Sequence, residues 1–581
     1  MPIGDTVDQL MALAGKPRDM LADRTTALQK EQIAVTELSA LLISFQYVSQ
    51  NLGKPDVYDQ RQVSSSNENL LLATMTGKPP SGTYQFTPLR MSQHQQMLSS
   101  GFKSDSAPIG EGSFSFRYGA DVQRSSPLEL LGGGAGITRG RIRITDRSGT
   151  SSEIDLSTAQ TIDDVLDAIN SNTALNVTAT THGDRFQLID NTGQSVSNLM
   201  VQELGGGSTA ASLGLAGISA ASDTATGQDI LRLTNETELD LLNDGNGVAI
   251  SPVLHDLEYE LRDGTTGTID FSPIVAGSSE VDKETTLGEI IEIINAQDPD
   301  KLHVEIGPDG DRLVTTDLTE GTGSFTIKSR SPDEAATAES LGIAGESSDG
   351  VITGRRLLGG LRTVLVSSLA GGQGLGELGA LELTDRNGAS DTVVLSSAET
   401  LEEVIEIINA AEVGIVASVN DAKNGIRLTD TTGSFASNLI VADADDKGTA
   451  GKLGLTADTS ENLADSGDMH LQVVSGNTKL SDLNGGAGVR RGNIQIFDSL
   501  GHQDLLKVDS DVETVDDLIR AINRLNLNGG VLAELNETGD GIRLLDKAGG
   551  EGKLQVYEKG SSTAADLHLM GGMKEVDVGG E

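Results

Sequence analysis

The sequence predicts an α+β protein of several domains, with an N-terminal helical leg of coiled-coil-like spacing, a β-rich segment and four tandem small ββαββ-like domains. Three observations predict this arrangement. Apolar residues near the N-terminus recur at helical intervals. The next part of the chain alternates apolar and polar residues between turn-forming phrases. From about residue 129 onward, one ten-residue phrase that ends in Ile-Asn returns four times.

Length and charge exclude several classes of protein. The 581 residues suffice for about three to six domains. The 86 acidic residues outnumber the 42 basic ones, so we expect no nucleic-acid partner and no attraction to anionic membranes. The absence of cysteine rules out disulfides and thiolate metal sites. No segment reads as a signal peptide or as a membrane-spanning helix, so no membrane insertion is expected.

Residues 1–53 are predicted to be the helical leg. A first amphipathic helix includes Val7, and we expect Gly15 and Pro17 to interrupt it. In the helix that follows, apolar residues from Leu38 and Leu41 onward recur at alternating steps of three and four, which is heptad spacing. Two interpretations stay open: a helical hairpin packed on its own domain, or a coiled-coil leg that awaits a partner helix.

Residues 54–128 are predicted to be rich in β-strands. The phrases "GTYQFTPLRMSQ" and "GSFSFRYGADV" alternate as strands do, and "KPPSG" is typical of a turn. This segment also holds much of the aromatic content, which is only 3% overall. We therefore expect a β-rich region distinct from both the leg and the repeats.

The repeats divide the rest of the chain into four units. Each combines a Gly-rich opening such as "LLGGGAGITRG", a strand–turn phrase such as "GRIRITDRSG", the Ile-Asn phrase and two further strands. The asparagines that end the phrase are more than about 100 residues apart, which is too long for a solenoid repeat and suits tandem domains. The predicted units are residues 129–230, 231–352 (the most divergent), 353–470 and 471–581.

The four phrases, "TIDDVLDAIN", "TLGEIIEIIN", "TLEEVIEIIN" and "TVDDLIRAIN", each predict a short helix. The threonine is an N-cap, the acidic residue three positions later completes a capping box, and the apolar residues share one face. We expect the final asparagine to adopt the left-handed conformation that ends a helix. The structural residues of the phrases are Thr161, Ile169, Asn170, Thr286, Ile294, Asn295, Thr400, Ile408, Asn409, Thr514, Ile522 and Asn523.

No motif in the sequence indicates catalysis or a cofactor. The seven histidines form no metal-binding spacing, and no nucleophile elbow or Walker loop is present. The Gly-rich phrase leads into a strand rather than a helix, so it predicts a linking turn instead of a phosphate site. Acidic turns such as "DNTG" and "VADADDK" suit β-turns, and calcium binding is the alternative. We expect a non-enzymatic assembly or binding protein with no cofactor and no metal.

Residues 6–46, "TVDQLMALAGKPRDMLADRTTALQKEQIAVTELSALLISFQ", resemble the N-terminus of the flagellar hook-associated protein 2 family, the filament-capping proteins known as FliD. Residues 73–119 look like the continuation of that region, and the resemblance is continuous over about residues 5–125. The repeated phrases resemble the flagellin hook IN motif of flagellar axial proteins. The "QLMAL" start argues against the related hook–filament junction proteins.

The resemblance implies a structural function in the bacterial flagellum. Such a protein forms a homo-oligomeric ring or plate at the extracellular filament tip, promotes flagellin polymerisation and prevents loss of monomers. Implied partners are flagellin, hook–filament junction proteins and the flagellar type III export apparatus, which needs no cleaved signal peptide. The residues expected to face the filament or neighbouring subunits are Leu10, Leu13, Leu38, Leu41 and Phe45.

Two departures from the family pattern accompany the resemblance. The family ends in a helical region that pairs with the N-terminal helices, and no returning helix is visible after the fourth repeat. Four repeated units are also more than a typical cap protein carries. The alternative function is a secreted adhesin that binds surface ligands through the acidic modules. A glycan hydrolase on repeated binding modules is a third option, and no site in the sequence supports it.

Overall fold

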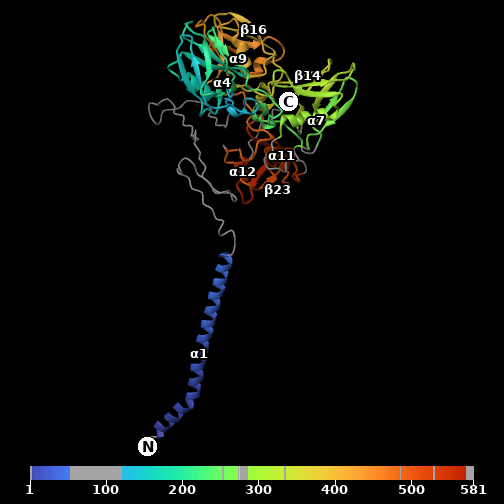
Figure 1. Ribbon diagram of the computed structural model, residues 1–581. Helices are drawn as coiled ribbons and strands as arrows, with labels where there is room; N and C mark the ends of the chain where they lie inside the picture. The colour runs from blue at the N-terminus through green and yellow to red at the C-terminus, as the bar shows by residue number, and fades with distance from the viewer. Residues whose placement is uncertain are drawn as a thin grey trace. The chain divides into compact units, whose positions relative to one another are not determined.

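In the computed structural model, the chain divides into two compact units, residues 1–111 and 112–581. Figure 1 shows the long helix of the first unit and the helices and strands of the second. The structure describes residues 3–52, 121–251, 254–272, 274, 285–332, 335–484, 486–527 and 530–570. The predicted β-rich segment, residues 54–128, falls outside these ranges except for its last residues, from position 121.

The first unit contains one long helix, α1 (Ile3–Leu52). Its 50 residues correspond to a length of about 75 Å at the rise of an α-helix. The expected interruption at Gly15 and Pro17 is wrong, because the helix continues through both residues. Pro17 lies inside it, and the helix bends toward its N-terminal end, as a residue without an amide N–H and with a bulky ring requires (Figure 1). The helical hairpin is excluded for residues 3–52 by the same continuity.

The second unit contains four modules, each with a ββαββ core followed by further short elements, so the α+β class is confirmed. Module 1 (Leu128–Thr226) consists of η1 (Leu128–Leu130), β1 (Arg141–Thr145), β2 (Ser151–Asp155), α3 (Ile162–Asn170), β3 (Val177–His182), β4 (Arg185–Asp190), β5 (Leu199–Glu203), α4 (Thr209–Ser212), β6 (Ser219–Ala220) and β7 (Thr224–Thr226). The elements after β4 were not predicted.

Modules 2 and 3 repeat the complete plan. Module 2 (Leu239–Thr353) consists of η2 (Leu239–Leu241), α5 (Leu242–Gly245), β8 (Leu257–Glu260), β9 (Thr266–Ile269), α7 (Leu287–Gln297), β10 (Leu302–Ile306), β11 (Leu313–Asp317), β12 (Phe325–Ser329), α8 (Thr337–Ser340), β13 (Gly345–Ser347) and β14 (Val351–Thr353). Module 3 (Val366–Asp465) consists of η3 (Val366–Ser368), η4 (Ala370–Gly372), β15 (Ala380–Thr384), β16 (Ser390–Val394), α9 (Leu401–Asn409), β17 (Ile415–Val419), β18 (Ile426–Asp430), β19 (Leu439–Asp443), α10 (Thr449–Lys452), β20 (Ala457–Thr459) and β21 (Leu463–Asp465).

Module 4 (Gly492–Asp566) has the same strands and helices from its first strand through the short helix that follows the fifth strand. It consists of β22 (Gly492–Phe497), β23 (Gln503–Val508), α11 (Val515–Asn523), β24 (Val531–Leu535), β25 (Ile542–Asp546), β26 (Gln555–Glu558) and α12 (Thr563–Asp566).

Each module is built from two small antiparallel sheets. In module 1 the sheets have the orders β2-β1-β5-β6 and β3-β4-β7, and modules 2 and 3 repeat both orders with their own strands. Register follows the apolar residues, because Ile142 pairs with Ile154 across β1–β2 and Ile144 pairs with Val201 across β1–β5. All four of these side chains are buried, so a shift by one residue would turn the apolar set toward solvent.

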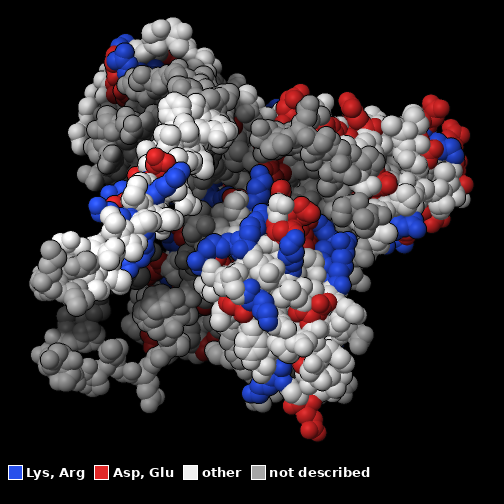
Figure 2. Space-filling model, turned by 90° about the horizontal axis from the view of Figure 1, so that it is seen from below, with Lys and Arg blue, Asp and Glu red and all other residues white. Residues whose placement is uncertain are grey.

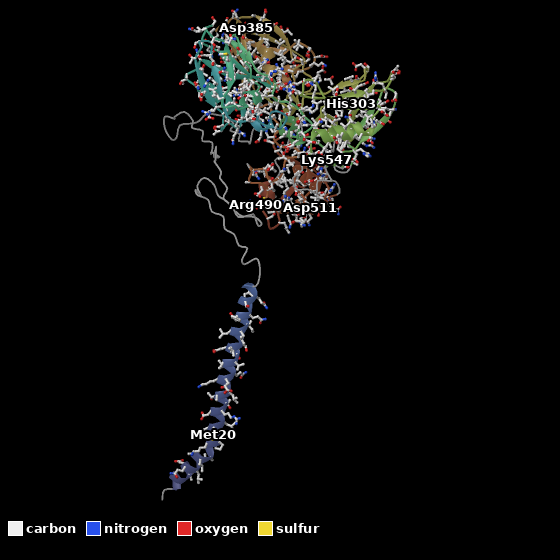
Figure 3. All side chains as sticks on the ribbon, viewed as in Figure 1. Met20, His303, Asp385, Arg490, Asp511 and Lys547 are labelled. Carbon is white, nitrogen blue, oxygen red and sulfur yellow. The ribbon has the colours of Figure 1, made fainter. Side chains whose placement is uncertain are left out.

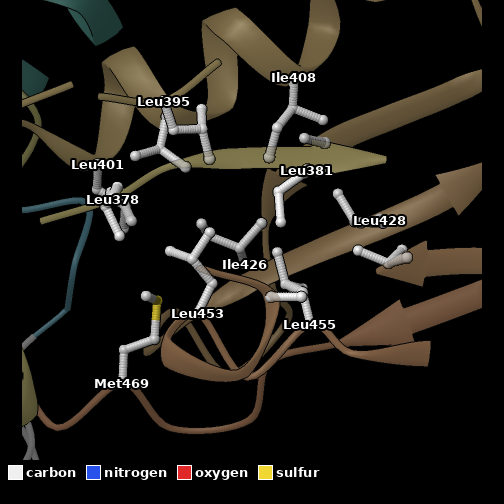
Figure 4. Packing of buried hydrophobic residues seen from close by; sticks show 14 of the residues in the cluster. Leu378, Leu381, Leu395, Leu401, Ile408, Ile426, Leu428, Leu453, Leu455 and Met469 are labelled. Atoms are coloured by element: carbon white, nitrogen blue, oxygen red, sulfur yellow. The ribbon is translucent and has the colours of Figure 1, made fainter. Parts of the chain in front are cut away.

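The buried apolar residues form four clusters, one in each module. Figure 4 shows the cluster of module 3, where Leu401 and Ile408 of α9 pack over Leu381 of β15 and Leu428 of β18. The helix therefore closes over both sheets. Such a helix of nine residues is marginal alone and depends on this packing.

A Gly-rich loop opens each module, and it is a turn as the sequence predicted. In module 1 the Gly136 N–H donates to the Leu131 carbonyl at 2.9 Å, and the Gly132 N–H donates to the Ile230 carbonyl at 2.8 Å. Gly133 has a φ of +71°, and a Cβ there would lie 2.2 Å from Thr234. Glycine is thus required by the left-handed backbone and by close contact with the segment that leads to module 2.

The segments that lead into the modules pack in two different ways. Four or five residues before the bridge to each N-cap threonine, an apolar residue is buried: Val122, Leu233, Leu361 or Val474. Val364, next to the bridge of module 3, is also buried and packs in the core of module 3 itself. Leu233 and Val474 pack in the cores of the modules they precede, namely 2 and 4. Val122 precedes module 1 but packs in the core of module 3, and Leu361 precedes module 3 but packs in the core of module 1.

Backbone hydrogen bonds fix this reciprocal exchange. The Val122 N–H donates to the Lys423 carbonyl in the β17–β18 turn of module 3 at 2.8 Å. The Leu361 carbonyl accepts from the Ser126 N–H at 2.9 Å. Modules 1 and 3 therefore complete each other's cores, although module 2 lies between them in the sequence. The predicted domain boundaries remain predictions.

Candidate assembly site

The residues expected to mediate assembly are exposed along α1. The exposed fractions are 61% for Leu10, 59% for Leu13, 57% for Leu38, 67% for Leu41 and 72% for Phe45. Figure 3 shows side chains that project from α1 along its length, with Met20 among them. None of these side chains belongs to a buried apolar cluster of the described residues, and a long helix with such a surface gains stability when something covers it.

Charge is distributed unevenly along α1. Residues 32–52 contain a single charged residue, Glu37, whereas the first part of the helix contains residues of both signs. Within this weakly charged part, large apolar residues lie on more than one face, because Leu41, Leu42 and Ile43 follow one another and are all at least 59% exposed. The heptad spacing noted in the sequence is therefore only part of the apolar surface. This second feature of the site could have been found in the sequence as a long stretch with a single charged residue.

The Ile-Asn helices have structural caps rather than reactive groups at their N-termini. In α3 the Asp164 N–H donates to Thr161 Oγ1 at 3.3 Å, and the Thr161 N–H donates to Asp164 Oδ2 at 3.0 Å. α9 and α11 have the same reciprocal pair, and in α7 the Thr286 N–H donates to Glu289 Oε2 at 3.0 Å. The isoleucines of the phrase, Ile169, Ile294, Ile408 and Ile522, are all buried. The acidic residues of the first turn thus serve the helix.

The asparagine of the phrase has a role that the sequence did not reveal. Asn170 is the last residue of α3 and does not adopt the left-handed conformation, so that expectation is wrong. Its side chain instead binds the edge of strand β3: Nδ2 donates to the Ala179 carbonyl at 3.0 Å, and Oδ1 accepts from the Ala179 N–H at 2.7 Å. The side-chain amide thus replaces a neighbouring peptide group at the sheet edge.

The same clamp is present in every module. Asn295 binds both backbone groups of Val304, Asn409 binds those of Ala417, and Asn523 binds those of Ala533. In all four modules the hydrogen bond that the asparagine Oδ1 accepts from the backbone N–H is 2.7 Å long, and the one that Nδ2 donates to the backbone carbonyl is 2.9–3.0 Å long. Only a planar amide offers a donor and an acceptor in this arrangement, so aspartate or leucine cannot replace it.

The acidic turns are occupied by hydrogen bonds within each module. Asp190 ends β4, and its carboxylate accepts from the Arg147 N–H at 2.8 Å and the Thr192 N–H at 3.0 Å. Burial alone would raise the pKa of Asp190, but these bonds and the Thr192 hydroxyl lower it overall. Asp430 in module 3 has the corresponding bonds with Arg386 and Thr432. Among the described residues, no group of three or more His, Cys, Asp or Glu side chains is arranged to hold a metal.

The surface of the second unit carries both signs of charge. On the face that Figure 2 shows, Lys and Arg side chains lie beside Asp and Glu side chains. Across the described stretches of residues 3–570, every helix is too short or too polar to cross a bilayer.

These features define a class of protein in structural terms: a long helix with an exposed apolar surface is joined in sequence to α+β modules whose polar side chains cap helices and close turns. Residues 1–95 match the family described as flagellar hook-associated protein 2 N-terminus. The resemblance of the N-terminal residues to that family is therefore confirmed, and the likeness of the repeated phrases to the flagellin hook IN motif remains a prediction. The match includes all of α1, and the four modules lie outside it. No curated protein and no solved structure matches the chain.

Proposed function

We propose that this protein is a subunit of the filament cap of the bacterial flagellum. It forms a homo-oligomeric ring or plate at the extracellular filament tip, promotes flagellin polymerisation and prevents loss of monomers. Its partners are other copies of the chain, flagellin, hook–filament junction proteins and the flagellar type III export apparatus. The observation that carries the proposal is that the family match falls on α1, whose apolar residues are exposed.

Assembly through α1 follows from its composition. Covering large apolar side chains contributes about 25 cal/mol per Å² of apolar surface removed from water. The part of α1 with one charged residue offers many such side chains and few charges that would need new partners. Leu10, Leu13, Leu38, Leu41 and Phe45 therefore face neighbouring subunits or the filament in the assembled state. The four modules form the head, in which the Ile-Asn helices are structural.

Deleting the gene tests the proposed function. We expect hooks without filaments and abundant flagellin in the culture medium, with filaments restored by the wild-type gene together with any sequence that continues it downstream. Normal filaments with lost surface attachment would contradict the cap and favour an adhesin.

A variant of α1 tests the proposed surface. Leu38→Gln, Leu41→Gln and Phe45→Gln together preserve helix propensity but remove the apolar surface. We expect the triple variant to lose oligomers in light scattering and to fail to restore filaments. The matched control is Val196→Gln with Phe435→Gln, because these module residues are 77% and 83% exposed and lie outside α1. Equal loss of assembly in both variants would show that α1 has no special role.

A further inference from the structure

The outer face of the first sheet of module 4 has a composition unlike that of the chain as a whole. Side chains on β22, β23 and β26, and on the residue directly after β26, point outward where they alternate with buried residues. None of these outward side chains is acidic, although the chain has a formal net charge of -44. We call this set the module 4 face: Asn493, Gln495, Phe497, Gln503, Leu505, Lys507, Gln555, Tyr557 and Lys559.

The module 4 face has exposed apolar groups around its middle. Phe497 and Tyr557 pack edge to face with ring centroids 5.6 Å apart, although only 3% of the chain is aromatic. Tyr557 is 49% exposed and Leu505 is 44% exposed. Gln495 lies between them, because it pairs with Leu505 on one side and with Tyr557 on the other. Aromatic side chains without acidic neighbours are typical of the centre of a protein–protein interface.

Two lysines supply the charge of the module 4 face. Lys507 Nζ lies 2.7 Å from Asp509, so its charge is matched locally. Lys559 Nζ lies instead 3.4 Å from the amide oxygen of Gln495. In the described part of the chain no carboxylate forms an ion pair with Lys559, so its charge can face a partner.

The equivalent outer face of module 2 carries an excess of negative charge. Lys328 is its one basic residue, and its Nζ lies 2.6 Å from Glu258. Glu260 and Glu346 both lie beside Thr326, on the two neighbouring strands, and neither forms an ion pair with a described residue. Two carboxylates in one row across a sheet repel each other and favour a cation from outside. We call this set the module 2 face: Glu258, Glu260, Thr266, Thr268, Thr326, Lys328 and Glu346.

The equivalent faces of modules 1 and 3 offer no such excess. In module 1, Arg141 and Arg143 lie opposite Asp155 and Glu153, so the charges balance within the face. On β15 and β16 of module 3, Glu382 is the one charged residue that points outward. The module 2 face is therefore the best match for the lysines of the module 4 face.

We propose that the module 4 face binds the module 2 face of a second copy of this chain. Phe497, Leu505 and Tyr557 are covered in this contact, and Lys559 lies against the glutamates of the partner copy. Because the two faces belong to different modules, the contact is heterologous and can continue from copy to copy. The proposal rests on the proposed function, in that assembly through α1 brings copies together and this contact sets how their modules meet.

Charge complementarity is the reason to expect a second copy as the occupant. Copies of so acidic a chain repel one another over most of their surface. Contact is favourable only where one side lacks carboxylates and the other side presents them, as these two faces do. The same repulsion excludes contact of the module 2 face with itself.

Cross-linking of the full chain through introduced cysteines tests the contact, since the chain has no cysteine of its own. The test variant carries Gln503→Cys in the module 4 face and Thr266→Cys in the module 2 face. We expect a short bis-maleimide to give products of two and more copies. The control combines Thr266→Cys with Ser390→Cys, because Ser390 lies opposite Thr384 in module 3 as Gln503 lies opposite Phe497. Equal yield from both variants, or no product between chains, would overturn the proposal, whatever light scattering reports about assembly through α1.

Charge reversal in the test variant distinguishes a second copy from any other partner. Lys559→Glu and Glu260→Lys should each lower the yield of product between chains by about tenfold, because like charges would then face each other. A mixture of the two reversed variants should restore the yield, because each altered face meets its complement. Glu382→Lys is the control on the equivalent face of module 3 and should leave the yield unchanged. If the mixture gave no more product than either variant alone, the module 4 face would bind something other than the module 2 face, and the proposal would be wrong.

Discussion

Modules 1 and 3 differ from modules 2 and 4 in how their cores are completed. Modules 2 and 4 bury the apolar residue of their own lead-in segment, Leu233 or Val474. Modules 1 and 3 exchange theirs, so that Leu361 fills the core of module 1 and Val122 fills that of module 3. The difference shows that modules with the same arrangement of strands and helices can complete their cores with residues from different parts of the chain. Modules 2 and 4 use their own lead-in residues, whereas modules 1 and 3 are coupled.

The largest effect is expected from a substitution that breaks this coupling between modules 1 and 3. Leu361 is fully buried, so Leu361→Ala should lower the free energy of unfolding of module 1 by about 2–5 kcal/mol through lost contacts and a cavity. Hydrogen exchange should accelerate in β3 and β4 of module 1, although the substitution lies next to module 3 in the sequence.

Leu233→Ala is the matched control for this prediction. Leu233 is 4% exposed and packs in the module it precedes. Its substitution should accelerate exchange in module 2 and leave module 1 unchanged. If Leu361→Ala loosened only the strands of module 3, the exchange of lead-in residues would be refuted.

A smaller effect is expected at the asparagine clamp, which all four modules share. Asn170→Ala leaves both backbone groups of Ala179 without their side-chain partner, and should cost about 1–3 kcal/mol of module stability. Asn295→Ala should have a similar effect in module 2, because the clamp acts within each module and does not depend on the lead-in residue. Local hydrogen exchange at β3 and at β10 measures both.

Asn198→Ala provides a comparison for the clamp. Asn198 is exposed, and its amide donates to the Ser219 hydroxyl at 3.0 Å. We expect a change below about 0.5 kcal/mol, as for most surface substitutions. A similar loss at Asn198 and Asn170 would mean that the clamp adds nothing beyond an ordinary surface hydrogen bond.

The smallest effect is expected at the helix caps. Thr161→Ala removes the acceptor for the Asp164 N–H and should cost module 1 about 1 kcal/mol, whereas Thr161→Ser should preserve most of the stability. Thermal unfolding and exchange at the first turn of α3 measure the difference. Equal stability of the alanine and serine variants would be inconsistent with a stabilising cap.

Much of each module could be predicted because its signals are local. The threonine, the acidic residue and the spaced apolar residues each act within one turn of a helix, so the ten-residue phrase was sufficient to predict α3. The strands before and after it alternate regularly and were also predicted. The short strands β6 (Ser219–Ala220) and β7 (Thr224–Thr226) were missed, since two or three residues show no periodicity.

Other features could not be predicted because they depend on tertiary structure. Asparagine at a helix end suits several roles, and only the position of β3 selects the clamp. Val122 and Leu361 are apolar wherever they pack, so the sequence does not indicate which core receives them. Pro17 usually ends or kinks a helix, and here α1 bends and continues. The exposed α1 residues were anticipated from spacing and family resemblance, and their assembly role remains a prediction.

The exchanged residues impose an order of folding. A chain that emerges from the ribosome with its N-terminus first presents all of module 1 before Leu361, which follows the whole of module 2. Module 1 can form its secondary structure early, but its core stays incomplete until Leu361 arrives. Closing so long a loop adds little to the equilibrium cost but delays the contact. Module 1 therefore completes its core only after synthesis has passed the middle of the chain, whereas module 2 needs no residue beyond its own segment.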